Sequence, residues 1–225
     1  MSGFHAVADS SSGVGSRNAS PKLSANAVNV RPAVLFARAD SVYKSLDCDV
    51  WDAERDARNY LGSAPVVAHP PCRAWGQLRH FARPRPDEKA LAPFAVDMVR
   101  KFGGVLEHPR KSSLWPVLGL PSPGKLDKFG GWTLPIFQSW FGHRAEKSTF
   151  LYIVGVRYAD IPEMPIVLGR ATHVISQSNA VGRISGVRLK AGDVGYRPEV
   201  TKAEREHTPL ELACWLLDLA GRCHV

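Results

Sequence analysis

The sequence lacks any apolar run long enough to cross a lipid bilayer, and no basic segment followed by an apolar core precedes residue 30. It also has few cysteines, and none of the four forms a CxxC pair of the kind that binds zinc. Their irregular spacing argues against a disulfide framework. We therefore expect a soluble, cytoplasmic protein with no membrane partner.

Basic residues are in excess in this chain of 225 residues. Lys and Arg number 29 against 21 Asp and Glu, a formal net charge of +8. Such a balance suits a polyanionic partner, and we expect DNA. Residues 1–30 are poor in large apolar side chains and predict a flexible tail, whereas 31–225 predict a single α/β domain. Nothing in the composition indicates an obligate protein partner.

The apolar pattern after residue 30 alternates between strands and helices. Strand-like runs occur at 33–37, 49–51, 65–68, 105–106, 132–137 and 150–156. Apolar residues recur at helical spacing over 87–102, between two of these runs. A helix that connects two strands predicts parallel pairing, so we expect a mostly parallel sheet with helices on both faces.

Further elements are predicted from local signals. Asp52 caps an expected helix over 53–60, and the Pro- and Gly-rich stretch 116–131 predicts a loop. Thr208 and Glu211 form a capping box with Pro209 at the first helical position of a terminal helix. Residues 157–200 have little hydrophobic periodicity and several basic side chains. They predict a short basic segment that leaves the sheet and whose surface binds a partner, which we call the basic excursion.

Two strand ends carry side chains that could take part in a reaction. The run that ends at Ala68 is followed by Pro70 and Pro71, which place Cys72 on a rigid turn just past a buried strand. Glu107 follows the next strand, at the same edge of a parallel sheet. Cys72 is therefore either a small buried hydrophobic residue or a nucleophile.

The order of these motifs resembles that of the DNA cytosine-5 methyltransferases. The segment 70–72 is similar to the Pro-Cys loop of that family, and 106–109 is similar to its Glu-Asn-Val segment, with His in place of Asn. A polar connector then leads into the strand-like segment 150–156, which contains Ile-Val-Gly. The chain thus resembles a small, divergent member, of the kind carried by bacteriophages or prophages, which implies a Rossmann-like sheet and residence in a bacterial or phage-infected cell.

The resemblance implies a covalent mechanism on a cytosine flipped out of the duplex. The Cys72 thiolate would add to carbon 6, and a protonated Glu107 would bind ring atom N3 and the exocyclic amine. The family places an arginine near O2 from a Gln-x-Arg-x-Arg segment. That pattern is not intact here, and Arg144 and Lys147 are the nearest substitutes.

The resemblance also implies a small-molecule methyl donor, S-adenosyl-L-methionine, bound at a Phe-x-Gly-x-Gly loop. The corresponding segment 36–40 contains no glycine. The cofactor-binding candidates are Phe36, Asp40, Asp52, Glu54, Pro70 and Thr208. The DNA-binding candidates are Arg73, Trp75, Arg79, Arg183, Arg188 and Lys190, with Trp75 stacked on the extruded base.

Two other functions are compatible with the same residues. The missing glycines favour a DNA-binding module of methyltransferase fold that has lost the cofactor. Alternatively, Cys72 and nearby histidines would bind zinc in a hydrolase or deaminase. Those histidines are His69, His80, His108 and His143.

Overall fold

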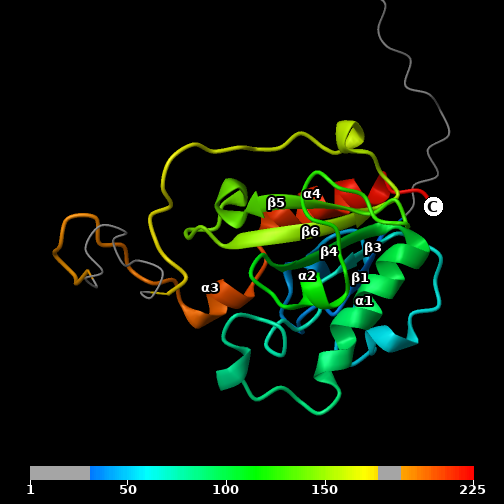
Figure 1. Ribbon diagram of the computed structural model, residues 1–225, viewed down its shortest axis with the longest axis horizontal. Helices are drawn as coiled ribbons and strands as arrows, with labels where there is room; N and C mark the ends of the chain where they lie inside the picture. The colour runs from blue at the N-terminus through cyan, green and yellow to red at the C-terminus, as the bar shows by residue number, and fades with distance from the viewer. Residues whose placement is uncertain (1–30, 177–188) are drawn as a thin grey trace, which may run out of the picture.

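Six strands form one mixed sheet in the computed structural model, which describes residues 31–176 and 189–225 (Figure 1). The strands are β1 (Ala33–Leu35), β2 (Asp49–Trp51), β3 (Val66–Ala68), β4 (Gly104–Pro109), β5 (Trp132–Phe137) and β6 (Ser148–Val154). Their order across the sheet is β2-β1-β3-β4-β6-β5. The α/β arrangement and the six strand positions expected from the sequence are thus present, with shifts of a few residues at their ends.

The sheet is mostly parallel. Strands β2, β1, β3 and β4 run in one direction, whereas β6 pairs antiparallel with both β4 and β5. The carboxyl ends of β1, β3 and β4 therefore meet at one edge, and the beginning of β6 lies at that same edge. This geometry brings segments distant in sequence to a common place.

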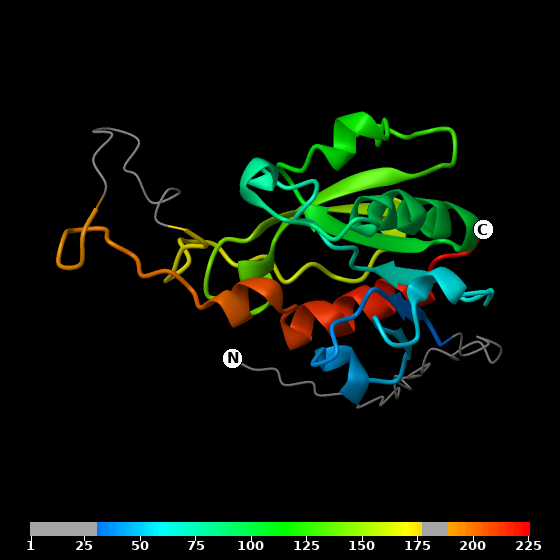
Figure 2. The same ribbon diagram turned by 90° about the horizontal axis from the view of Figure 1, so that it is seen from below.

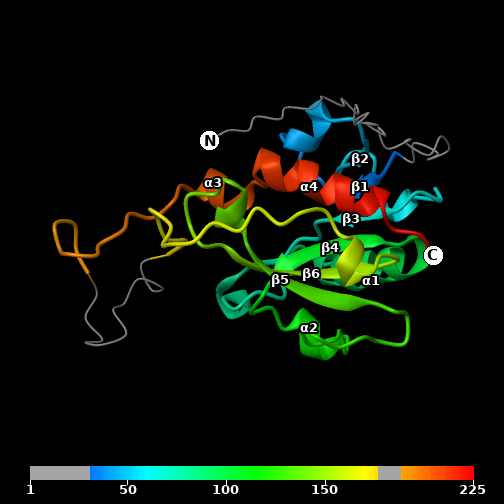
Figure 3. The same ribbon diagram turned by 90° about the horizontal axis from the view of Figure 1, so that it is seen from above.

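Helices cover both faces of the sheet (Figures 2 and 3). Helix α1 (Glu88–Phe102) packs on β3 and β4 from one side, and α4 (Leu210–Gly221) packs on the same strands from the other. Alternate residues of each strand serve the two cores: Val34, Val67 and Val105 belong to the cluster that includes α4, whereas neighbouring strand residues join the cluster that includes α1. Strands β1 and β3 are apolar and buried on both faces, as expected of the centre of such a sheet.

The shorter helical elements connect these layers. They are η1 (Val42–Ser45), η2 (Ala57–Asn59), η3 (Arg79–Phe81), α2 (Leu114–Val117), η4 (Gln138–Phe141), η5 (Tyr158–Asp160) and α3 (Lys202–Glu206). Helix α2 was not expected; it lies at the start of the stretch predicted as loop. Helix α3 was not expected either, and the Thr201 side chain caps it by accepting a hydrogen bond from the backbone N–H of Glu204.

Two local predictions were wrong. The expected helix at 53–60 is a turn followed by η2, because Asp56 adopts a positive φ of 52°, which a continuous α-helix does not tolerate. The Asp52 carboxylate still accepts hydrogen bonds from backbone N–H groups, at Glu54 and Arg55. Helix α4 begins after Pro209, which is the N-cap itself, and no side chain caps it.

The expected basic excursion is described only in part. Its described arms, 157–176 and 189–200, contain η5. One isolated bridge joins His173 to Ala145, and a second joins the two arms to each other at Val174 and Glu199. Figure 1 shows the arms extending beyond the sheet on the side of α3. The predicted tail at 1–30 lies outside the described residues. No helix within 31–176 and 189–225 has the length and apolar character needed to cross a membrane.

Candidate functional site

A cavity of about 780 Å³ opens at the carboxyl ends of β1, β3 and β4. Its walls also include Lys147, which directly precedes β6, together with α3 and the connection between α3 and α4. Several residues selected from the sequence line it: Phe36, Pro70, Cys72, Arg73, Glu107, Lys147 and Thr208. The volume is within the range of ligand-binding pockets and can hold a nucleotide.

Cys72 occupies the turn that follows β3. Its carbonyl accepts hydrogen bonds from the backbone N–H groups of Trp75 and Gly76, at 3.0 and 2.7 Å, so the segment curls back as soon as the two prolines end. The side chain is exposed to the cavity, which excludes a role as a buried core residue. Desolvation and then the charge of Glu107 raise the pKa of the thiol, whereas Lys147 and Arg73 lower it.

Glu107 is fixed by hydrogen bonds to both of its oxygens. Nδ1 of His69 lies 3.2 Å from Oε2, and Nε2 of Gln138 donates to Oε1 at 3.0 Å. Burial alone would raise the pKa of this carboxyl, but the His69 hydrogen bond and the nearby Lys147 outweigh burial and lower it to about 2. The lowered pKa favours the carboxylate form of Glu107 in the free protein, and the protonated Glu107 that the resemblance implies stays a prediction.

The residues around Glu107 form a connected network that the sequence reasoning missed. The Tyr43 hydroxyl lies 2.9 Å from Nε2 of His69, and the Gln138 amide also donates to the Thr149 hydroxyl at 3.1 Å. Tyr43 comes from η1 and Gln138 from η4, at the connection between β5 and β6. Of these residues, only His69 is marked in the sequence, because it lies between a strand end and two prolines. From sequence alone it is considered as a zinc ligand and not as a partner of Glu107.

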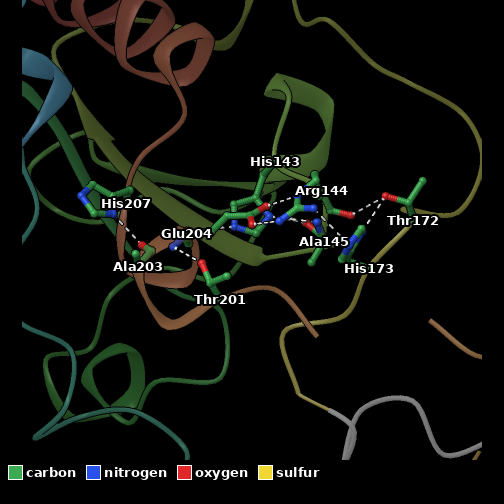
Figure 4. Close-up of polar contacts among 9 residues, drawn as sticks. All are labelled: His143, Arg144, Ala145, Thr172, His173, Thr201, Ala203, Glu204 and His207. Carbon is green, nitrogen blue, oxygen red and sulfur yellow. Dashed lines mark hydrogen bonds and ion pairs between the residues drawn. The ribbon is translucent and has the colours of Figure 1, made fainter. Parts of the chain in front are cut away.

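Lys147 and Arg144 have different surroundings, although the sequence offered both as the cation of the site. Lys147 directly precedes β6 and lines the cavity, and its ammonium group makes no ion pair within the described residues. Arg144 binds Glu204 through two hydrogen bonds and does not line the cavity (Figure 4). The prediction of Arg144 as a catalytic residue is therefore wrong, because its guanidinium binds the Glu204 carboxylate of α3 outside the cavity.

The carboxylates expected to bind S-adenosylmethionine are not gathered in the cavity. Asp40 pairs with Arg38 and His207, and Asp52 pairs with Lys44. Asp52 and Glu54 line a second cavity, of about 570 Å³. The predicted cofactor-binding roles of Asp40, Asp52 and Glu54 are therefore wrong for this cavity. Asp40 and Asp52 are paired with basic side chains, and Asp52 and Glu54 line the second cavity.

The loop after β1 nevertheless has an unusual backbone. Phe36 adopts a positive φ of 64°, a conformation that normally favours glycine, and its ring packs edge-on against Phe94. The wall next to it carries the cations Arg38, Lys202 and Arg205. Glu206 also lines this wall, but it pairs with Arg38 and is not free to hold a ligand. Because Lys202 and Arg205 oppose a sulfonium and the one carboxylate of the wall is paired, the residues present do not fit S-adenosylmethionine.

The expected DNA-binding residues are scattered. Arg73 lines the cavity and pairs with Glu88 at 2.7 Å, while Arg79 is exposed on η3 and Lys190 is exposed on a loop. Trp75 is 5 % exposed and its indole N–H donates to the Lys89 carbonyl, so it is a core residue and its predicted stacking on a base is corrected. Arg183 and Arg188 lie outside the described residues.

The zinc alternative has no support in the arrangement of side chains. Within 31–176 and 189–225, no three His, Cys, Asp or Glu residues are grouped so as to hold a metal ion. His80 is exposed, His108 is buried with neither ring nitrogen hydrogen-bonded, and the His143 Nε2–H donates to the Glu204 carbonyl. His69 instead binds Glu107.

The comparisons with known proteins found no counterpart. No protein-family model matches the chain, and neither the curated proteins nor the solved structures contain a match. The function is therefore argued from the cavity and its residues.

Proposed function

We propose that the cavity receives a cytosine flipped out of DNA and that Cys72 adds covalently to carbon 6 of its ring. The observation that carries this proposal is the convergence of Cys72, Glu107 and Lys147 on one cavity. Cys72 follows β3, Glu107 lies within β4, and Lys147 directly precedes β6, the strand that pairs with β4. In this order they match the thiol, acid and cation of cytosine-5 methyltransferases. The mixed sheet, with helices on both faces, is compatible with a Rossmann-like methyltransferase fold.

The proposed chemistry follows from these three groups. Cys72 loses its proton to solvent, its sulfur forms a bond to carbon 6, and the electron pair of the 5,6 double bond moves toward carbon 5. The Glu107 carboxylate accepts a hydrogen bond from the exocyclic amine and stabilises a ring protonated at N3. Lys147 supplies positive charge for the O2 side, where negative charge accumulates.

The adduct makes carbon 5 nucleophilic toward any electrophile in the cavity. The resemblance implies a methyl group from S-adenosylmethionine, but the residues present do not fit that cofactor, and we assign no transfer step through it. A solvent proton is sufficient to reveal the adduct. It adds to carbon 5, the original hydrogen leaves as a proton, and the thiolate is then expelled from carbon 6.

Exchange of the carbon 5 hydrogen tests this proposal without a methyl donor. Single-stranded and duplex oligonucleotides containing cytosine are incubated with the protein in D₂O, digested, and examined as nucleosides by mass spectrometry. We expect one deuterium in deoxycytidine and none in thymidine. Cys72→Ser should abolish the exchange, and Cys214→Ser, which alters the other exposed cysteine, should preserve it.

The engagement of Asp40 and Asp52 by basic partners favours a second candidate function, a DNA-binding module of the same fold without catalysis. Tight DNA binding by the wild-type protein with no exchange at carbon 5 would favour this module. Absence of both binding and exchange would contradict both functions.

A further inference from the structure

We infer that the wall of the cavity next to the loop after β1 binds a phosphate group. We name it the α3 wall and define it by six residues that line the cavity: Arg38, Lys202, Arg205, Glu206, His207 and Thr208. The inference goes beyond the proposed function and does not depend on it, because none of the three groups proposed to act on cytosine belongs to this wall.

The acidic side chains of α3 are bound by arginines from other segments. The helix carries equal numbers of basic and acidic side chains: Lys202 and Arg205 against Glu204 and Glu206. Arg144, which precedes β6, binds Glu204 outside the cavity (Figure 4). Arg38, which follows β1, donates to Glu206 at 2.9 Å. The two cations of α3 are thereby left without a carboxylate from their own helix.

Lys202 and Arg205 keep their positive charge on the cavity side. Neither makes an ion pair within 31–176 and 189–225, and the Arg205 guanidinium donates to the Ile175 carbonyl at 3.3 Å, a contact that holds the side chain without neutralising it. Residues three apart on a helix share a face, so these two charges are neighbours. Like charges on one face repel each other, and an anion bound between them relieves the repulsion.

The rest of the lining adds to this charge. Five Lys or Arg side chains line the cavity against two Glu. Glu107 is hydrogen-bonded to His69 and Gln138, and Glu206 accepts from an arginine, so both carboxylates are engaged. A cavity lined mainly by one sign of charge concentrates ions of the opposite sign. An anionic ligand therefore meets free donors, whereas a cationic ligand meets no free carboxylate.

Phosphate suits this pair of donors. Its dianion matches two positive charges, and three of its oxygens are strong acceptors. The guanidinium of Arg205 presents a planar fork of N–H groups that fits two phosphate oxygens, and the ammonium of Lys202 binds phosphate as a point charge. The Thr208 hydroxyl adds a donor on the same wall.

Two sources supply such a group. A free phosphorylated molecule brings a phosphate that lies beside the proposed cytosine, whereas DNA brings a phosphate of its own backbone. The chemistry at the wall is the same for both, and competition between phosphate and DNA separates them.

Isothermal titration calorimetry of the full chain with inorganic phosphate, at constant ionic strength and mildly alkaline pH, tests the wall. We expect saturable binding of one phosphate per chain. Lys202→Gln combined with Arg205→Gln should weaken binding by about 10-fold or more, because charge-assisted hydrogen bonds are lost. Lys101→Gln combined with Lys125→Gln removes the same charge from exposed lysines outside the cavity and should change the affinity by less than about 2-fold.

Two further variants test the charge of the wall itself. Glu206→Gln removes its carboxylate and should strengthen phosphate binding by about 3-fold, a gain that a merely structural role of the pair with Arg38 would not produce. If the double variant at Lys202 and Arg205 does not fold, Lys202→Glu, which reverses the charge of an exposed side chain, should still weaken binding by about 10-fold. Circular dichroism verifies that each variant is folded.

A duplex oligonucleotide containing cytosine then identifies the source of the phosphate group. If inorganic phosphate weakens DNA binding by the parent protein but not by the double variant, the wall holds a backbone phosphate. If saturating DNA leaves the affinity for inorganic phosphate unchanged, the wall holds a free phosphorylated molecule. Phosphate binding without any DNA binding would contradict the proposed function and support the phosphate site.

Three results would overturn the inference. The first is the absence of saturable phosphate binding by the parent protein at millimolar concentration, which would leave the proposed cytosine chemistry untouched. The second is an equal loss of affinity in the α3 double variant and the lysine control, because binding would then depend on net charge alone. The third is weaker phosphate binding by folded Glu206→Gln, which contradicts the electrostatic argument.

Discussion

His69 and Glu107 lie side by side because β3 and β4 pair in parallel with Ala68 opposite Leu106, which places the next residue of each strand at the same level. The contact joins the end of one strand to the other strand across 38 residues of sequence. Both residues line the cavity into which the Cys72 thiol is exposed, so their contact fixes the position of two side chains of its wall.

The reactivity of Cys72 should depend on its charged neighbours. Its pKa is raised above the usual 9.0, so in the free protein alkylation by iodoacetamide should accelerate only at alkaline pH. Glu107→Gln removes a negative charge and should lower this apparent pKa, whereas Lys147→Met should raise it further. Rates measured by mass spectrometry in a Cys214→Ser background isolate the Cys72 thiol; identical profiles in both variants would contradict the electrostatic coupling.

Lys147 and Arg144 should contribute unequally to the reaction. Lys147→Met removes a cation that lines the cavity beside Glu107 and should slow deuterium exchange at carbon 5 by about 100-fold, the typical effect of losing one charge-stabilising donor. Arg144→Met breaks the pair with Glu204 outside the cavity and should leave the rate unchanged. Equal losses in the two variants would show that the pair with Glu204 opens when DNA binds.

His108 should make the fold sensitive to mild acid. It is fully buried without a hydrogen-bond partner for either ring nitrogen, and burial lowers its pKa from 6.5 to about 4. The unfolded chain therefore binds more protons between these pH values, and stability should fall by about 3 kcal/mol from this residue as the pH drops through that window.

Replacement of His108 checks this prediction. His108→Leu should remove the acid-dependent loss between pH 6.5 and 4 in urea denaturation curves, with little change at pH 8, because an apolar side chain suits the site. The exposed His80→Leu is the control. Glu107 acts in a lower window: its pKa of about 2 stabilises the fold above pH 4.5, and that contribution is lost as the pH falls toward 2.

Gly104 should be essential to the pairing that forms the site. A Cβ atom at this position would lie 2.0 Å from the Val66 carbonyl oxygen, and φ is 117°. Gly104→Ala should therefore destabilise the protein by more than about 3 kcal/mol by separating β3 from β4. Gly124→Ala, at a positive φ but in open space, should cost only about 1–2 kcal/mol in the same thermal denaturation measurement.

Binding of DNA should depend on the cations of the α3 wall. Lys202 lines the cavity and makes no ion pair within the described residues. Lys202→Ala should weaken DNA binding similarly for all sequences and reduce the slope of log affinity against log salt by about 1. An unchanged slope, measured by fluorescence anisotropy at several salt concentrations, would show that this wall does not contact phosphate.

Local patterns determined the strands, helix α1 and the edge at which Cys72 and Glu107 meet. Hydrophobic periodicity is a property of neighbouring residues, and a helix between two strands restricts their direction, so both features can be inferred from sequence. The turn after Asp52 could not, because the positive φ of Asp56 overrides the helical signal.

Only the tertiary structure decided which polar side chains share the site. Arg144 is held by Glu204, 60 residues away, whereas Tyr43 and Gln138 reach the cavity through His69 and Glu107. Ion pairs and hydrogen bonds depend on which partners the fold brings within about 3 Å, and no spacing along the chain encodes that proximity. The order of motifs in the sequence thus predicts a thiol and a carboxylate at one edge of the sheet, and the folded chain decides which side chains hydrogen-bond to that carboxylate.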